Sequence, residues 1–103
     1  MKRRYLALQI EVERMPNERE FIDAVWSSIV QLYGEFGASQ TGLALISYDI
    51  ERNSAVIRTA LGALSMVRSS VALITSLAGT KASVHILVIS GTIKSLCPKP
   101  TQK

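Results

Sequence analysis

The sequence is poor in several residue types, and each shortage excludes a class of protein. A single cysteine, Cys97, excludes an internal disulfide and a multi-cysteine zinc site. No apolar run approaches the roughly 18 residues that a membrane-spanning helix needs, and no glycine-rich phosphate loop of standard spacing is present. Residues 5–11 alternate between apolar and polar side chains, so we expect no signal peptide. Together these shortages predict a cytoplasmic protein of a reducing compartment that does not bind membranes.

The most uneven shortage is that of carboxylates. Residues 52–103 contain seven lysines and arginines and no Asp or Glu, whereas residues 1–51 contain five basic and eight acidic side chains. A half-chain without carboxylates cannot neutralise its own cations, so it attracts polyanions by Coulomb steering and counterion release. This distribution favours nucleic acid or another phosphate-rich partner over ordinary solubilising charge.

Composition and apolar periodicity predict the fold. Of 103 residues, 48% are hydrophobic and 19% charged, which favours one folded domain at 1–96 with a flexible tail at 97–103. The patterns predict strands at 4–13, 43–50, 54–60 and 83–94, a helix from an Asn17 capping box to residues 33–36, and a helix at 62–78. The buried stripe of the first helix is expected to be Phe21, Val25, Ile29, Leu32 and Phe36. The order βαββαβ predicts an α+β, ferredoxin-like sandwich similar to RNA-recognition motifs, with a four-stranded antiparallel sheet and both helices on one face.

Two of the predicted strands are apolar on both sides, although the helices would cover only one face of the sheet. In the last predicted strand, strict alternation places Val84, Ile86 and Val88 on one side and Leu87, Ile89 and Ile93 on the other. In the second predicted strand, Leu43 and Leu45 lie on one side and Ala44 and Ile46 on the other. The predicted protein interface combines one side of each strand: Leu87, Ile89, Ile93, Ala44 and Ile46. Uncovered apolar surface of this extent marks an interaction site, so we expect a protein partner or self-association. Whether the sheet face or a helix face meets the partner is left open by the sequence.

The sequence offers no catalytic constellation. His85 lies in the last strand with no cysteine or carboxylate nearby in sequence, and Glu11 and Glu13 share a strand face that is usually solvated. Serines at helical spacing in the second helix have no base beside them. We therefore predict no catalytic and no metal-binding residue. The alternative is a ferredoxin-like small-molecule module, either a regulatory domain or an acylphosphatase-like hydrolase. Residues 12–16 do not match the phosphate-binding loop of acylphosphatases. A regulatory domain is normally attached to an enzyme domain, for which we expect no room in 103 residues.

RNA recognition by stacking on the sheet is not favoured by the aromatic content. Tyr5 is the only aromatic residue of the first predicted strand, and residues 54–60 contain none. We therefore expect contacts from Arg and Lys to backbone phosphates, which position the RNA without reading its sequence. The predicted RNA-binding residues are Lys2, Arg3, Arg4, Arg52, Arg58, Arg68, Lys81 and Lys94.

Several segments resemble one known family in the correct order. They are Arg3-Arg4-Tyr5-Leu-Ala-Leu, Ala24-Val-Trp-Ser-Ser-Ile, Leu32-Tyr-Gly-Glu-Phe-Gly-Ala-Ser39, Tyr48-Asp-Ile-Glu-Arg-Asn-Ser-Ala-Val-Ile-Arg58, Val67-Arg-Ser-Ser-Val-Ala-Leu-Ile74 and Val88-Ile-Ser-Gly-Thr-Ile-Lys94. Over residues 3–96 the chain resembles archaeal ribonuclease P protein component 2. Some relatives extend further at the carboxyl end, so contacts made by such extensions do not carry over.

The resemblance implies a non-catalytic subunit of an RNA-based endonuclease that removes 5′ leaders from precursor tRNA. In this family the RNA performs catalysis and positions Mg²⁺, and the protein binds no cofactor. Component 2 pairs with ribonuclease P protein component 3, and two pairs join through component 2 into a heterotetramer that supports the catalytic domain of the RNA. Precursor tRNA is then an indirect partner, and the sequence leaves open whether the chain also touches it directly. Arg58, Arg68 and Lys94 lie inside matching segments and are the strongest candidates for RNA contact.

Overall fold

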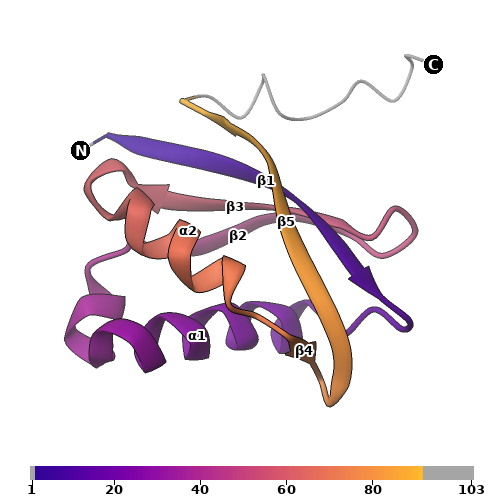
Figure 1. The fold of residues 1–103 in the computed structure, drawn as a ribbon. Helices are drawn as coiled ribbons and strands as arrows, with labels where there is room; N and C mark the ends of the chain where they lie inside the picture. Colours follow the sequence, from indigo (N-terminus) through magenta and orange to yellow (C-terminus); the bar gives the residue numbers. More distant parts are fainter. Residues whose placement is uncertain (1, 92–103) are drawn as a thin grey trace.

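The structure is a computed structural model that describes residues 2–91 (Figure 1). Its elements are β1 (Arg3–Val12), α1 (Glu18–Ser39), β2 (Ala44–Asp49), β3 (Ser54–Ala60), the 3₁₀ helix η1 (Leu61–Ala63), α2 (Leu64–Ala72), β4 (Ser76–Leu77) and β5 (Thr80–Ser90). The predicted tail at 97–103 lies outside the described residues, as do Ile93 and Lys94.

The strands form an antiparallel sheet in the order β2-β3-β1-β5-β4, with both helices on one face (Figure 1). The predicted fold class is confirmed, but the sheet has five strands because a short strand, β4, follows α2. The prediction that α2 continues to residue 78 is wrong. Ala78 and Gly79, at φ 51° and 81°, form a two-residue turn that pairs β4 with β5, and positive φ at both central positions is the geometry of tight hairpins.

Helix α1 begins as predicted and ends later than predicted. The backbone N–H of Glu20 donates to Asn17 Oδ1 at 2.8 Å, and the backbone N–H of Asn17 donates to Glu20 Oε1 at 3.0 Å, which completes the capping box. At Gly34 the backbone leaves helical geometry (φ 79°, ψ 170°), but the helix resumes and reaches Ser39. Glycine adopts this positive φ without a steric penalty, so Gly34 produces a kink instead of an end.

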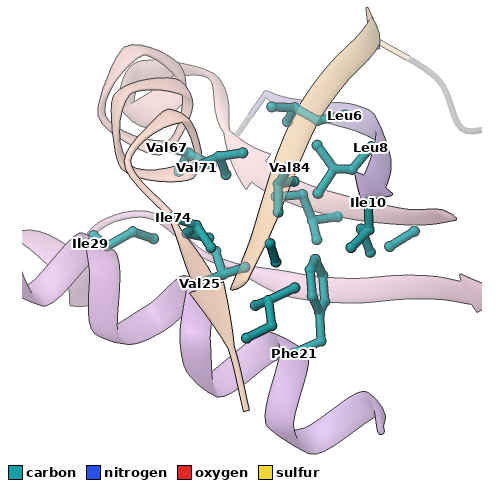
Figure 2. Packing of buried hydrophobic residues seen from close by; sticks show 14 of the residues in the cluster. Leu6, Leu8, Ile10, Phe21, Val25, Ile29, Val67, Val71, Ile74 and Val84 are labelled. Carbon is teal, nitrogen blue, oxygen red and sulfur yellow. The ribbon is translucent and has the colours of Figure 1, made fainter. Parts of the chain in front are cut away.

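The core lies between the sheet and the two helices (Figure 2). Leu6, Leu8 and Ile10 of β1 alternate toward the helices, where they meet side chains of α1 and α2. These contacts include the fully or almost fully buried Phe21, Val25, Ile29, Val67 and Val71. Burying each large apolar side chain contributes about 1.5–3 kcal/mol, so this layer holds the helices against one face of the sheet. The other face is not covered by any described element.

A β-bulge changes which residues of β5 face the core. Ala7 pairs with Val88 but Leu8 pairs with Ile86, so Leu87 is an extra residue in the strand. Ile89 therefore pairs with Leu6 and packs against the core, and its predicted place on the uncovered face is wrong. Val88 lies on the uncovered face instead. A one-residue shift reverses every later side chain in a strand, and strict alternation cannot foresee it.

Candidate nucleic-acid interface

The uncovered side of the sheet, called the open face below, is built from rows of paired residues. Opposed residues of an antiparallel ladder point to the same face, so the register defines each row. The first row is Ala44, Arg58, Tyr5 and Ser90; the second is Ser47, Val56, Ala7 and Val88; the third is Asp49, Ser54, Gln9 and His85. Along β1 the open face thus passes from a cationic and aromatic row, through a largely apolar row, to a row with a carboxylate and an imidazole.

Four of the predicted RNA-binding residues gather at one end of the sheet, called the basic end: Lys2, Arg3, Arg4 and Arg58. Arg3 and Arg4 pair with the last residues of β3, and the carbonyl of Lys2 accepts a hydrogen bond from the Leu61 backbone N–H at 3.0 Å. Arg4 Nη1 donates to the carbonyl oxygen of Arg3 at 2.9 Å. Within residues 2–91 none of the four cations is paired with a carboxylate. Their positive potential is therefore not cancelled locally.

The opposite end of the sheet, the acidic end, carries the carboxylates Glu11, Glu13, Asp49 and Glu51. Arg52 lies in the β2–β3 turn, where its Nε is 3.7 Å from Asp49 Oδ2 and its backbone N–H donates to Asp49 Oδ1 at 3.1 Å. Lys81 pairs with Ser76 at the start of β5, which also lies at this end. These two predicted residues are thus separated from the basic end, and Arg52 is in addition paired with a carboxylate.

The remaining predicted RNA-binding residues are Arg68 and Lys94. Arg68 is exposed on α2 and lines a groove of about 370 Å³ together with Ser65, Ser69, Ala72 and Ile86. This groove is on the helix side of the molecule and does not belong to the open face. Lys94 lies outside the described residues. The structure therefore brings together four of the eight predicted residues, and the RNA-binding role of each stays a prediction.

Arg58 has an unusual environment within the basic end. Its Nε is buried and has no hydrogen-bond partner among the described residues. Tyr5 and Ala44 are its direct neighbours on the two adjacent strands. The pairing of Tyr5 with Arg58 was not evident from the sequence, because it depends on the register between strands that are about fifty residues apart.

Exposed apolar side chains include two groups on separate elements, besides the single residues Ile50, Leu61 and Leu73. The bulge residue Leu87 is 58% exposed, and Val88 on the open face is 48% exposed. Ala44 is half-buried on the open face, whereas Ile46, predicted at the same interface, is an unpaired bulge residue of β2 that lines a groove with Glu18, Arg19 and Ile22 of α1. The second surface, the α1 patch, consists of Trp26, Leu32, Tyr33 and Phe36, and Phe36 is 80% exposed. Leu32 and Phe36 were expected in the buried stripe, which the structure contradicts. The core-facing stripe is interrupted near Gly34, where the helix kinks.

A tyrosine near the acidic end joins α1 to the sheet. The Tyr48 hydroxyl donates to the carbonyl oxygen of Pro16 at 2.5 Å, and its ring centroid is 5.4 Å from that of Phe21. Burial raises the pKa of Tyr48 above its ordinary value, and the nearby charges of Glu20 and Glu18 raise it further. At neutral pH Tyr48 is therefore a stable hydrogen-bond donor.

The fold and its charges define a two-layer α+β sandwich with one uncovered sheet face and one basic end. In the described residues no three His, Cys, Asp or Glu side chains gather as a metal site, and no helix there has the length and apolarity to cross a membrane. Residues 4–99 match the Rpp14/Pop5 family, and the chain belongs to this family. The resemblance seen in the sequence is thereby confirmed.

The relatives carry one common name. The chain is 32% identical over 95 residues to ribonuclease P protein component 2 of Pyrococcus furiosus, an alignment that covers 92% of this chain and 79% of the relative. It is 35% identical over 94 residues to the Archaeoglobus fulgidus protein of the same name, covering 90% and 83% of the two chains. A chain in the cryo-EM structure of yeast ribonuclease MRP matches with a TM-score of 0.73 at 18% identity, covering 89% of this chain and 76% of that one, and this likeness confirms the fold.

Proposed function

We propose that this chain is a protein subunit of ribonuclease P, the RNA-based endonuclease that removes 5′ leaders from precursor tRNA, and that the RNA performs the cleavage. The observation that carries this proposal is the family match over residues 4–99, almost the whole chain. The relatives named ribonuclease P protein component 2 match over most of their own length. The role of the chain is to bind the catalytic domain of the RNA and stabilise its folded form, and precursor tRNA is contacted through that RNA.

The basic end supplies the principal RNA contact. Its cations have no carboxylate partner within residues 2–91, and the guanidinium groups of Arg3, Arg4 and Arg58 can each hold a phosphate through two parallel hydrogen bonds. Such contacts position an RNA backbone and carry no sequence information. Arg68 adds a contact on the helix side, and Lys94, outside the described residues, adds another. Arg52 contributes less because it is paired with Asp49, and Lys81 contributes less because it is distant from the basic end.

The mechanism is charge neutralisation. RNA helices that crowd together repel one another, and Mg²⁺ normally offsets this repulsion. Fixed guanidinium and ammonium groups at the RNA surface replace part of that counterion requirement. The chain itself holds no cofactor, and Mg²⁺ is bound by the RNA.

Two protein contacts complete the proposal. The chain binds ribonuclease P protein component 3, and two such pairs join through this chain into a heterotetramer in the cytoplasm. The two exposed apolar surfaces, the α1 patch and the surface around Leu87, support two contacts of this kind. Phe36→Ser and Leu87→Ser, each measured by sedimentation with and without component 3, assign one surface to the partner and the other to self-association.

Reconstitution of cleavage tests the proposal. The chain and component 3 are added to the ribonuclease P RNA of the same organism, and cleavage of precursor tRNA is measured over a series of Mg²⁺ concentrations. We expect the Mg²⁺ concentration for half-maximal cleavage to fall several-fold, and to rise again with Arg3→Gln/Arg58→Gln. Arg52→Gln is the matched control because Arg52 is paired with Asp49. An unchanged Mg²⁺ requirement would contradict the mechanism.

A further inference from the structure

The first row of the open face holds an aromatic ring beside a guanidinium group. Tyr5 of β1 and Arg58 of β3 are directly opposed in the antiparallel ladder, and both are half-buried. Directly opposed residues have Cβ atoms about 4.5–5.5 Å apart, within contact distance for side chains of this length. The ring and the guanidinium group therefore occupy adjoining positions on the surface of the sheet.

The neighbours of this pair are small. Ala44 on β2 and Ser90 on β5 complete the row, and Ala7 is the next residue of β1 on the same face. Alanine and serine side chains are too short to cover an aromatic ring or a guanidinium group. Tyr5 and Arg58 are consequently the largest groups in their row, and their side chains are the ones that a ligand at this row would contact.

Arg58 has hydrogen-bonding capacity that the described residues do not use. Arg58 Nε is buried without a partner, and within residues 2–91 Arg58 forms no ion pair. A buried donor without an acceptor is unfavourable, so an incoming anionic oxygen that draws the guanidinium group toward it relieves this cost. Arg3 is two residues before Tyr5 on the same side of β1, and it too has no carboxylate partner there. The position thus combines one π surface with two available cations.

We propose that Tyr5, Arg58 and Arg3 form a binding position for one unpaired nucleotide of RNA. The base stacks on the Tyr5 ring, and the flanking phosphates bind Arg58 and Arg3. Every base has a π face, so such stacking tolerates any sequence, but it requires a base that is not stacked inside a duplex. Among the described residues Tyr5 is the one Phe, Tyr or Trp on the open face, and the imidazole of His85 lies two rows away, so a single base is held at this position. This inference rests on the proposed function, which requires phosphate contacts and no base contact.

The test compares two oligomers that differ only in their bases. Binding of the full chain is measured for an eight-nucleotide oligouridine and for an abasic oligomer with the same number of phosphates. We expect the oligouridine to bind about ten-fold more tightly, as stacking on one ring supports. The ratio of the two affinities should fall to about one in Tyr5→Leu, while the affinity for the abasic oligomer stays unchanged. Arg58→Gln should weaken binding of both oligomers.

Two variants serve as controls for Tyr5→Leu. Tyr5→Phe keeps the ring and is expected to keep the ratio, which separates stacking from a hydroxyl contact. Tyr33→Leu removes an aromatic side chain that is 40% exposed in the α1 patch, and it is expected to leave the ratio unchanged. If Tyr5→Leu does not fold, the wild-type chain with labelled tyrosines provides the readout by NMR. Oligouridine then shifts the ring protons of Tyr5 upfield and does not shift those of Tyr33.

The outcomes distinguish this inference from the proposed function. Equal binding of both oligomers by the wild-type chain, or no upfield shift at Tyr5, overturns the nucleotide position and leaves phosphate binding by the basic end intact. Absence of salt-dependent binding to either oligomer overturns both the nucleotide position and the RNA contact of the basic end.

Discussion

The two ends of the sheet are made from the same strands, yet they have opposite electrostatic character. At the basic end, the first residues of β1 and the last residues of β3 place four cations together, with no carboxylate partner among the described residues. At the acidic end, Asp49 pairs with Arg52, and Glu11 Oε1 is 3.5 Å from His85 Nε2. A cation keeps its full positive potential only where the fold separates it from carboxylates, so the position of a cation in the sheet determines the charge that a polyanion would meet.

The largest effect is expected from removing the basic end. Arg3→Gln/Arg4→Gln/Arg58→Gln should reduce the slope of log affinity against log salt by about 2–3, because each lost phosphate contact removes about 0.7–0.9. Affinity for ribonuclease P RNA at low salt should fall at least about ten-fold. Filter binding over a salt series measures both. A slope equal to that of the wild type would place the RNA on another surface.

Reversing charge at the acidic end should have a smaller effect of the opposite sign. Glu13→Lys/Glu51→Lys places two cations on exposed positions that now carry carboxylates. We expect the salt slope to increase by about 1–2. Glu13→Gln/Glu51→Gln, the neutral counterpart, should give less than half of this change. If the reversal instead weakened binding, the acidic end would already be touching the RNA.

Tyr48→Phe should affect stability and leave RNA affinity unchanged. Loss of the hydroxyl bond to Pro16 should cost about 1 kcal/mol at neutral pH. The raised pKa of Tyr48 means that the unfolded chain loses this proton at lower pH than the folded chain does. Stability should therefore decline as the pH rises above the ordinary value of 10.0, and the variant should lack this part of the decline. Urea unfolding at pH 7 and at alkaline pH tests both statements.

The smallest effect is expected from Arg52→Gln. This side chain is exposed and already near Asp49, so its removal leaves the potential at the basic end unchanged. RNA affinity should stay within about two-fold of wild type. A loss of RNA affinity as large as the one caused by Arg58→Gln would contradict the functional distinction between the basic end and the acidic end.

Local signals in the sequence predicted the parts of the fold that depend on neighbouring residues. The capping box at Asn17 and the alternation of Leu6, Leu8 and Ile10 need only short-range information, and both were confirmed. The resemblance to a known family was confirmed in the same way, because it rests on ordered segments of sequence.

Features that depend on pairing between distant segments could not be predicted. The bulge at Leu87, which returns Ile89 to the core, is set by the match between β5 and β1. The opposition of Tyr5 and Arg58 is likewise a property of register. The charge imbalance between the halves of the chain was visible in the sequence, but the division of these cations between the two ends of the sheet requires the topology.

Backbone amide chemical shifts during titration with ribonuclease P RNA test the central claim most directly. Contact through the basic end predicts that amides of residues 2–5, 58–62 and 90–91 shift first and most. Amides of residues 49–53 and 81–85 should shift little. Dominant shifts at the acidic end, or along α1 alone, would contradict it.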